Sequence, residues 1–160
     1  MLTVKLFHNK ISDNILSLVK QALEETYPVE IEYSGHISLP SRAYDTERRQ
    51  YNAGILLGDL LTRRDIRFLV IEDDIYYPGM NFVFGLAAFY RGAILSTSRL
   101  DSDNLIRKEA IHEMGHVFGL KHCNNRCVMR YSNSLWDAKL KPSTLCSECK
   151  KQVLELIDQI

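Results

Sequence analysis

The sequence lacks an excess of either charge, since 20 lysine and arginine residues balance 20 aspartate and glutamate residues. Such a balance gives no electrostatic footprint for nucleic acid or for an anionic membrane surface. The chain also has no apolar run near the ~20 residues that a membrane-spanning helix requires. Its first residues, MLTVKLFHNKISDN, lack the basic start and the long apolar stretch of a secretory signal. We therefore expect a cytoplasmic protein that binds neither nucleic acid nor membrane.

Cysteine is scarce, and the four cysteines all lie in the last quarter of the chain. In a reducing compartment this clustering favours metal ligation over disulfides. Two close pairs on either side of residues 128–145 can form a closed tetrahedral zinc site. Mononuclear iron or an iron–sulfur cluster would use the same ligands. Iron–sulfur spacings usually place more cysteines close together, so we favour zinc. The four residues are Cys123, Cys127, Cys146 and Cys149.

The hydrophobic pattern predicts strands and helices that alternate along the chain. A strand over Leu2–Phe7, a helix from Ser12 to Pro28 and a strand over Val29–Tyr33 form a β-α-β unit. The further predicted elements are, in chain order, a helix from Asp45 to about Thr62, a buried strand over Phe68–Ile71, a hairpin with strands within Phe82–Tyr90 and Ala93–Leu95, a helix over Leu105–Leu120 and a final helix after Leu145.

The stretch HEMGHVFGLKHC has the residue types and the spacing of a metal site. His112 and His116 are four residues apart, so on a helix both project from one face and can bind one ion. Glu113 lies beside them, where its carboxylate can take a proton from metal-bound water. Gly119 can adopt a positive φ and turn the chain, which brings His122 back to the same ion. Three histidines leave one position of Zn²⁺ free for water, as in catalytic sites.

The simplest alternative is a core helix whose histidines only make hydrogen bonds. For this composition the full pattern arises by chance with a probability on the order of 10⁻⁵. We therefore reject that alternative for the motif. His8 and His36 lie alone among strand and turn residues, and we expect them to be hydrogen-bonded or exposed rather than to bind metal.

The pattern HExxHxxGxxH with a methionine downstream resembles the metzincin clan of zinc metallopeptidases. The cysteines and the segments CVM, CSEC and PGMNFVFG resemble the archaemetzincin family in particular. One departure is that three residues separate the first two cysteines, where the family pattern usually has four. The resemblance implies two Zn²⁺ per chain: a catalytic one on His112, His116 and His122 with Glu113 as general base and acid, and a structural one on Cys123, Cys127, Cys146 and Cys149.

The resemblance also implies that Met129 is the residue of a Met-turn beneath the catalytic metal. Buried methionines more often only fill a core, and the position of Met129 soon after the third histidine is what favours the Met-turn. Tyr131 lies two residues further on, similar to a tyrosine that assists zinc in other metzincins. The hypothesis is that Tyr131 stabilises the oxyanion, although a tyrosine at such a position is more often simply packed or exposed.

We expect an α/β (α+β), metzincin-like fold with a twisted mixed sheet, helices and an active-site helix. Residues 1–160 would form a single catalytic domain. Within it, residues 1–120 would be an N-terminal α/β lobe that ends in the active-site helix, and residues 121–160 a small C-terminal lobe held by the Cys₄ zinc site. A lobe with so few apolar residues needs such a metal to stay folded.

The sequence thus predicts a monomeric zinc metallopeptidase. A peptide or protein substrate would lie along the sheet edge within Asn81–Ala88. One alternative is a zinc-stabilised peptide-binding or structural protein without turnover, against which Glu113 argues, because a structural ion needs no base. Another is a zinc ribbon that binds nucleic acid. The neutral charge and the absence of interleaved aromatic residues argue against that ribbon, whose basic patch would comprise Lys139, Lys141, Lys150 and Lys151.

Overall fold

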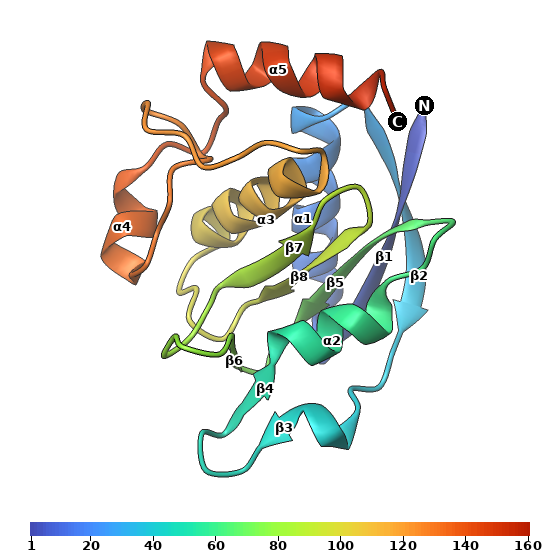
Figure 1. Cartoon of the computed structure of the whole chain (residues 1–160), viewed down its shortest axis with the longest axis vertical. Helices are drawn as coiled ribbons and strands as arrows, with labels where there is room; N and C mark the ends of the chain where they lie inside the picture. The colour runs from blue at the N-terminus through green and yellow to red at the C-terminus, as the bar shows by residue number, and fades with distance from the viewer.

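A five-stranded mixed sheet lies at the centre of the computed structural model, which describes residues 1–160 (Figure 1). Its strand order is β2-β1-β5-β8-β7. The first four strands of that order run parallel, and the edge strand β7 runs antiparallel to β8. The strands are β1 (Leu2–Asn9), β2 (Val29–His36), β5 (Ile66–Ile71), β7 (Gly85–Ala88) and β8 (Gly92–Ser96). The β7–β8 pair is the predicted hairpin.

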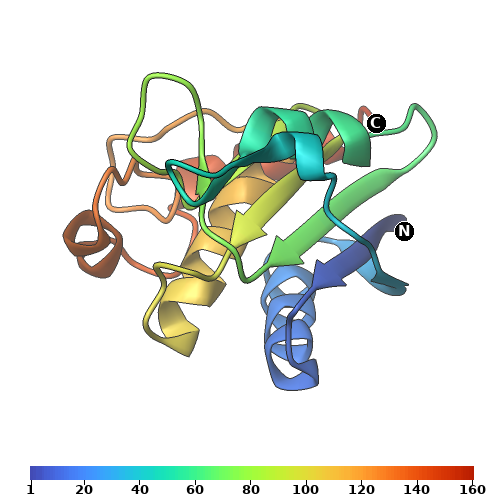
Figure 2. The ribbon, with the colours of Figure 1, turned by 90° about the horizontal axis from the view of Figure 1, so that it is seen from below.

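Helices cover both faces of this sheet (Figure 2). Helices α1 (Asp13–Thr26) and α3 (Asp103–Val117) lie on one face, and α2 (Ala53–Leu60) lies on the other. The side chains of the apolar run Phe68–Ile71 in β5 point alternately to the two faces. Phe68 and Val70 belong to a cluster of 30 buried residues that includes residues of α1 and α3, and Leu69 and Ile71 belong to a cluster of nine that includes residues of α2. Burial on both faces explains why this strand is continuously apolar. The predicted α/β class is confirmed.

The predicted helix from Asp45 to Thr62 is wrong in its first half. Residues 44–52 form a hairpin that belongs to a second, three-stranded sheet. The Oδ1 atom of Asp45 accepts the N–H groups of Glu47 and Arg48 in the hairpin turn, so it does not cap a helix. Helix α2 begins only after Asn52, whose side chain caps it. The elements of this region are the 3₁₀ helix Ser41–Ala43, β3 (Tyr44–Asp45), β4 (Gln50–Asn52) and β6 (Ile75–Tyr76).

The C-terminal residues pack onto the same core as α1 and α3. The predicted final helix is α5 (Ser147–Ile157), and a short helix that the sequence did not predict, α4 (Leu135–Leu140), precedes it (Figure 1). Ala138 of α4 and Val153 of α5 are buried in the larger cluster. None of the helices combines the length and the apolar character that crossing a bilayer would need.

Candidate active site

Helix α3 brings two of the three predicted histidine ligands together. His112 and His116 lie one turn apart, with their Nε2 atoms 3.1 Å from each other. His122 joins them from the segment after the helix, and the ligand nitrogens of all three lie within 4.8 Å of one another. Two imidazoles bound at about 2.0–2.1 Å to a tetrahedral Zn²⁺ would place their nitrogens about 3.3 Å apart. The donor atoms and their spacing therefore fit zinc.

The turn after α3 explains how His122 reaches this cluster. The N–H of Gly119 donates to the carbonyl of His116 over 3.0 Å, and the N–H of Leu120 donates to the carbonyl of Gly115 over 2.9 Å. These two bonds form a Schellman motif. Gly119 has a φ of 103°, which residues with a side chain rarely adopt. The prediction that Gly119 turns the chain and returns His122 to the helix is confirmed.

Backbone carbonyls orient the two helical histidines. The Nδ1 of His112 lies 2.9 Å from the carbonyl of Val128, and the Nδ1 of His116 lies 2.7 Å from the carbonyl of Leu120. Because a carbonyl only accepts, each Nδ1 carries the proton and each Nε2 keeps a free lone pair. Burial lowers the pKa of all three histidines, that of His112 well below its ordinary value. The rings are therefore neutral, the form that binds metal.

Glu113 is buried beside His112, between α3 and the edge strand β7. A Cβ atom at Gly85 of β7 would lie 2.7 Å from the Cγ of Glu113, so only glycine allows the strand to approach so closely. Burial, followed by the charge of Glu109, raises the pKa of Glu113 to about 8, against the opposing charge of Lys141. A carboxyl group with a raised pKa can both accept and return a proton near neutral pH.

A cleft of about 320 Å³ opens above these residues. One wall is apolar and consists of β7 and the segment before it, which includes Met80, Phe82 and Phe84. Residues of α3, His122 and Tyr131 also line the cleft. The ring of Tyr131 lies 5.0 Å from the ring of His122 and its side chain is half exposed. The edge strand that was predicted to bind substrate thus borders the histidine cluster.

The four cysteines form a second cluster next to the first one along the chain. Their sulfur atoms lie within 4.8 Å of one another, and Sγ of Cys123 is 3.9 Å from Sγ of Cys146. Thiolates bound at about 2.3 Å to a tetrahedral Zn²⁺ would be about 3.8 Å apart. The three-residue spacing between the first two cysteines therefore still closes the cluster. Burial alone would raise the pKa of the Cys146 thiol. A hydrogen bond from the backbone of Cys149, together with the side chains of Cys149, Asn125 and Cys127, instead lowers this pKa to about 7.

Residues 127–129 connect the two clusters. The backbone N–H groups of Met129 and Cys146 lie 3.4 Å and 3.3 Å from Sγ of Cys127. The carbonyl of Val128 holds His112, as described above. Met129 is fully buried and packs against α3 beside Gly115. One short segment thus contacts both clusters.

A model of peptidase family M54 matches residues 2–155. The chain belongs to peptidase family M54. The archaemetzincin of Nanoarchaeum equitans is 44% identical to it over 138 residues, which are 85% of this chain and 81% of the relative. Family membership identifies the chain as a zinc metallopeptidase, as its sequence predicts.

Two solved structures of the family share the fold. The archaemetzincin of Methanopyrus kandleri has a TM-score of 0.89 and 31% identity to this M54 chain, over 98% of this chain and 96% of the other. The archaemetzincin of Archaeoglobus fulgidus, solved with malonate, has a TM-score of 0.87 and 34% identity, over 94% and 99%. The fold is therefore that of the archaemetzincins.

A buried ion pair beside the histidines of this M54 chain was missed by the sequence analysis. The Nζ of Lys141 lies 3.1 Å from Oε1 of Glu109, and only 1% and 3% of the two side chains are exposed. The same Nζ donates to the carbonyl of Arg130 over 3.2 Å and lies 3.4 Å from Nδ1 of His112. Glu109 shares a helix face with Glu113, four residues on, which was an available signal. Nothing in the sequence marks Lys141 as its partner.

Three residues considered at the sequence level lie away from the site or in a different environment. His8 and His36 are in none of the metal-binding groups, and their ring centroids are 5.8 Å apart, with His36 in contact with Asn9. His36 is exposed, as predicted, whereas Nδ1 of His8 is buried without a hydrogen-bond partner. Lys141 is buried, so it cannot belong to an exposed basic patch. The nucleic-acid alternative loses one of its four lysines.

Proposed function

We propose that this chain hydrolyses peptide bonds at the three-histidine cluster, with Glu113 as general base and acid. The observation that carries the proposal is a buried carboxyl group beside three imidazoles whose nitrogens lie within 4.8 Å of one another and whose side chains line an open cleft. His112, His116 and His122 would hold Zn²⁺. Bound there, Zn²⁺ supplies the Lewis acidity that polarises a peptide carbonyl and lowers the pKa of water toward ~7.

The chain's own residues would carry the proton transfers. The carboxylate of Glu113 takes the proton from the attacking water and passes it to the nitrogen of the leaving amine. Glu113 lies against Gly85 of β7, so its carboxylate is close to this edge strand. The hydroxyl of Tyr131, which also lines the cleft, donates a hydrogen bond to the carbonyl oxygen as negative charge develops there.

The substrate would lie extended in the cleft, antiparallel or parallel to the free edge of β7. Strand β8 occupies the other edge of β7, so the outer edge has free backbone groups for a peptide. The apolar wall that includes Met80, Phe82 and Phe84 would receive substrate side chains. This arrangement supports a peptide or protein as the substrate.

The four-cysteine cluster would hold a second Zn²⁺ with a structural role, and Met129 would support the histidine cluster as the Met-turn residue. Four thiols complete a tetrahedral shell and leave no position for substrate. Residues 1–160 would then act as a single catalytic domain, with residues 1–120 and 121–160 as its two lobes. A cytoplasmic setting, where thiols stay reduced, would suit a cluster of cysteines that binds metal.

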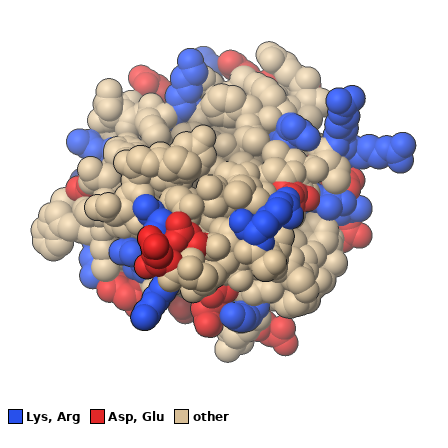
Figure 3. Space-filling view, turned by 60° about the horizontal axis from the view of Figure 1, so that its bottom comes forward, with Lys and Arg blue, Asp and Glu red and all other residues tan.

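We also propose that the enzyme acts as a monomer without nucleic acid or membrane partners. On the face shown in Figure 3, basic side chains lie singly or beside acidic ones rather than in one broad patch. Together with the balanced total charge, this distribution gives little attraction for a polyanion.

The decisive experiment combines metal analysis with peptide digestion for wild type and Glu113→Gln. We expect two zinc ions per chain in both proteins and a loss of about 10²–10⁴-fold in kcat for the variant, the usual contribution of a general base. Glu155→Gln, at an exposed position of α5, is the matched control and should keep full activity. Full turnover in a zinc-loaded Glu113→Gln protein would refute the role of Glu113. A zinc-loaded wild type that binds peptides without cleaving them would favour the binding-protein alternative.

A further inference from the structure

The segment between β6 and β7 forms one wall of the cleft without belonging to the five-stranded sheet. At its base, the N–H of Val83 donates to the carbonyl of Ile75 over 3.0 Å, and the N–H of Ser96 donates to the carbonyl of Phe84 over 2.9 Å. Residues 77–82 extend beyond these anchors, and Met80 and Phe82 from this tip line the cleft. The shape of the apolar wall therefore depends on what holds the tip.

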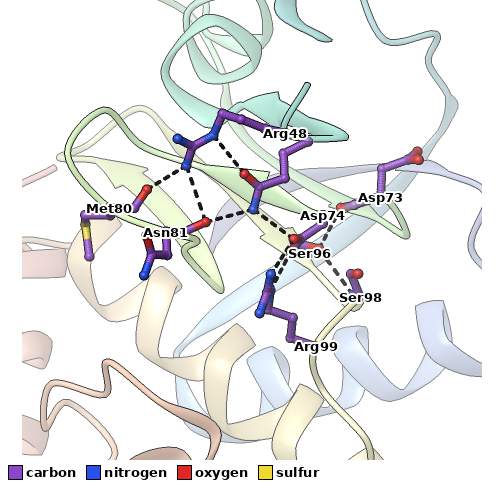
Figure 4. Close-up of polar contacts among 9 residues, drawn as sticks. Arg48, Asp73, Asp74, Met80, Asn81, Ser96, Ser98 and Arg99 are labelled. Atoms are coloured by element: carbon purple, nitrogen blue, oxygen red, sulfur yellow. Dashed lines mark hydrogen bonds and ion pairs between the residues drawn. The ribbon is translucent and has the colours of Figure 1, made fainter. Parts of the chain in front are cut away.

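Two side chains from the β3–β4 hairpin bind the backbone of this tip. Arg48 donates through one terminal nitrogen to the carbonyl of Met80 over 2.7 Å and to that of Asn81 over 3.4 Å (Figure 4). Gln50 donates through Nε2 to the same Asn81 carbonyl over 2.9 Å. Carbonyl groups at the tip thus have partners from a segment about 30 residues earlier in the chain.

The two binding side chains are themselves held in place. The guanidinium of Arg48 lies 3.9 Å from the centre of the Tyr76 ring, and its Nε donates to Oε1 of Gln50 over 2.9 Å. Gln50 is buried and donates to Asp74 over 2.9 Å. Since ordering a long side chain costs entropy, an exposed arginine with this many contacts is held in a specific conformation.

The same network reaches the tip at a third point. Asp74 accepts two hydrogen bonds from Arg99, over 2.9 Å and 2.8 Å (Figure 4). The guanidinium of Arg99 in turn lies 4.1 Å from the centre of the Phe82 ring. Phe82 packs edge to face on Phe84, with ring centres 5.2 Å apart. A single chain of contacts therefore fixes both the backbone of the tip and one of its cleft-lining side chains.

We propose that Arg48 and Gln50 are positioning residues for the substrate: they hold the tip so that Met80 and Phe82 form the wall against which an apolar substrate side chain packs. This inference rests on the proposed function of the cleft. Neither residue lines the cleft, so both act through the tip. Loss of these contacts should weaken substrate binding much more than it slows the chemical step. His112, Glu113 and His116 lie on α3 and His122 follows that helix, so none of them is part of residues 77–82.

The test compares Arg48→Met, which keeps the aliphatic stem, with the conservative Arg48→Lys. The control is Arg42→Met, an exposed arginine that pairs with Asp59 of α2 outside the cleft. Three quantities are measured on the zinc-loaded protein: hydrogen exchange of residues 77–84, KM and kcat for peptides rich in apolar residues, and the Kd of the same peptides in a Glu113→Gln background.

For Arg48→Met we expect exchange in residues 77–84 to be about tenfold faster and KM and Kd to rise about tenfold, as loss of charge-assisted hydrogen bonds implies. The kcat should stay within about twofold, the pattern of lost ground-state binding. Arg48→Lys should recover part of both effects, and Arg42→Met should show neither. In the Glu113→Gln background, a peptide without apolar side chains should bind with the same Kd whether or not Arg48→Met is present.

Each contrary result has its own meaning. Unchanged hydrogen exchange in Arg48→Met would show that Arg48 does not hold residues 77–82 in place. Faster exchange with unchanged KM and Kd would overturn its role in substrate positioning. A wild type that binds peptide without cleaving it would overturn the proposed function, and the Kd comparison would still decide this inference. If no peptide bound to the wild type, both proposals would be wrong.

Discussion

His122 and Cys123 are neighbours in the chain, yet they belong to two clusters of opposite design. The histidine cluster has three ligand nitrogens and opens into a cleft, with a buried carboxyl group beside it. The cysteine cluster has four thiol groups, and backbone N–H groups lie within hydrogen-bond distance of those of Cys123 and Cys127. A set of four ligands suits a metal that only stabilises, and a set of three with a base suits one that reacts.

We expect the histidine cluster to depend on the cysteine cluster. The third histidine directly precedes a cysteine ligand candidate, and the carbonyl that orients His112 belongs to Val128, which follows another. Residues 118–134 contain no helix or strand, so we expect a metal on the cysteine cluster to help fix their path. The geometry of the histidine cluster would then depend on the cysteine cluster. Four perturbations, ordered by expected effect, can break or sharpen this relation.

Removal of one cysteine should have the largest effect. In Cys149→Ser we expect one zinc per chain in place of two, because the buried thiol completes the cluster. Structural zinc contributes about 10–16 kcal/mol in zinc-finger peptides, so its loss should unfold the segment around residues 121–149. Hydrogen exchange there should approach the unfolded rate, and peptidase activity should disappear although His112, His116 and His122 are intact.

The matched control is Ser147→Ala, at an exposed position in the same turn of α5. It should keep both metals and full activity. If Cys149→Ser kept slow exchange and normal turnover, the histidine cluster would not depend on the cysteine cluster.

Separation of the buried ion pair should have the next largest effect. Lys141→Met leaves Glu109 buried without its cation, which typically costs about 3–5 kcal/mol of unfolding free energy. Replacing both partners, Lys141→Met with Glu109→Gln, should recover much of this loss, since no uncompensated charge remains. Urea denaturation gives the free energy of unfolding of wild type, of Lys141→Met and of the double variant.

Lys139 provides the control for this experiment. It pairs with Asp101 at the surface, where its side chain is 45% exposed, so Lys139→Met should cost less than about 1 kcal/mol. Equal losses in Lys141→Met and Lys139→Met would mean that the buried pair contributes no more to the free energy of unfolding than the surface pair does.

The turn that joins the two clusters should be the third most sensitive feature. Gly119→Ala forces a side chain into a positive-φ conformation, at a cost of about 1–3 kcal/mol. Its Cβ would also lie 3.0 Å from the hydroxyl of Tyr90. We expect weaker zinc binding at the histidine cluster, measured by chelator competition, with the cysteine zinc retained.

Gly58→Ala is the control for glycine replacement as such. Gly58 lies within α2, and no atom lies within 4 Å of an added Cβ there. The free energy of unfolding of this variant should be about 0.5–1 kcal/mol higher than that of wild type. If Gly119→Ala behaved in the same way and bound zinc normally, the turn would not be what places His122.

Features that are set by residues close together in the chain could be predicted from the sequence. The spacing of His112, Glu113 and His116 on one helix and the glycine turn are set within a few residues, so the sequence predicted them. The helix expected from Asp45 failed because the carboxylate of that residue bonds to the next turn, an equally local alternative that helical periodicity does not distinguish. The same periodicity correctly located α1, α3 and α5.

Features that join distant segments could not be predicted. Glu109 and Lys141 are 32 residues apart, and only the packing of the C-terminal segment on α3 makes them partners. The contacts of Arg48 with the tip of the cleft wall are similarly remote, and an exposed arginine in a turn usually has no role. Both features depend on tertiary structure that no periodicity or motif encodes.

The smallest expected effect concerns the open side of the histidine cluster. The loss of a single oxyanion donor usually lowers kcat about 10²–10³-fold. The side chain of Tyr131 is 48% exposed, so water competes for its hydrogen bond. We therefore expect Tyr131→Phe to lower kcat only about tenfold, with KM unchanged because the lost bond strengthens only in the transition state. The zinc content should not change. The control Tyr33→Phe, at an exposed position on β2, should be indistinguishable from wild type.

A Tyr131→Phe enzyme with normal kcat would remove the hydroxyl from the mechanism and leave zinc and Glu113 to stabilise the developing charge. A fall in bound zinc would instead place Tyr131 among the residues that hold His122 in position.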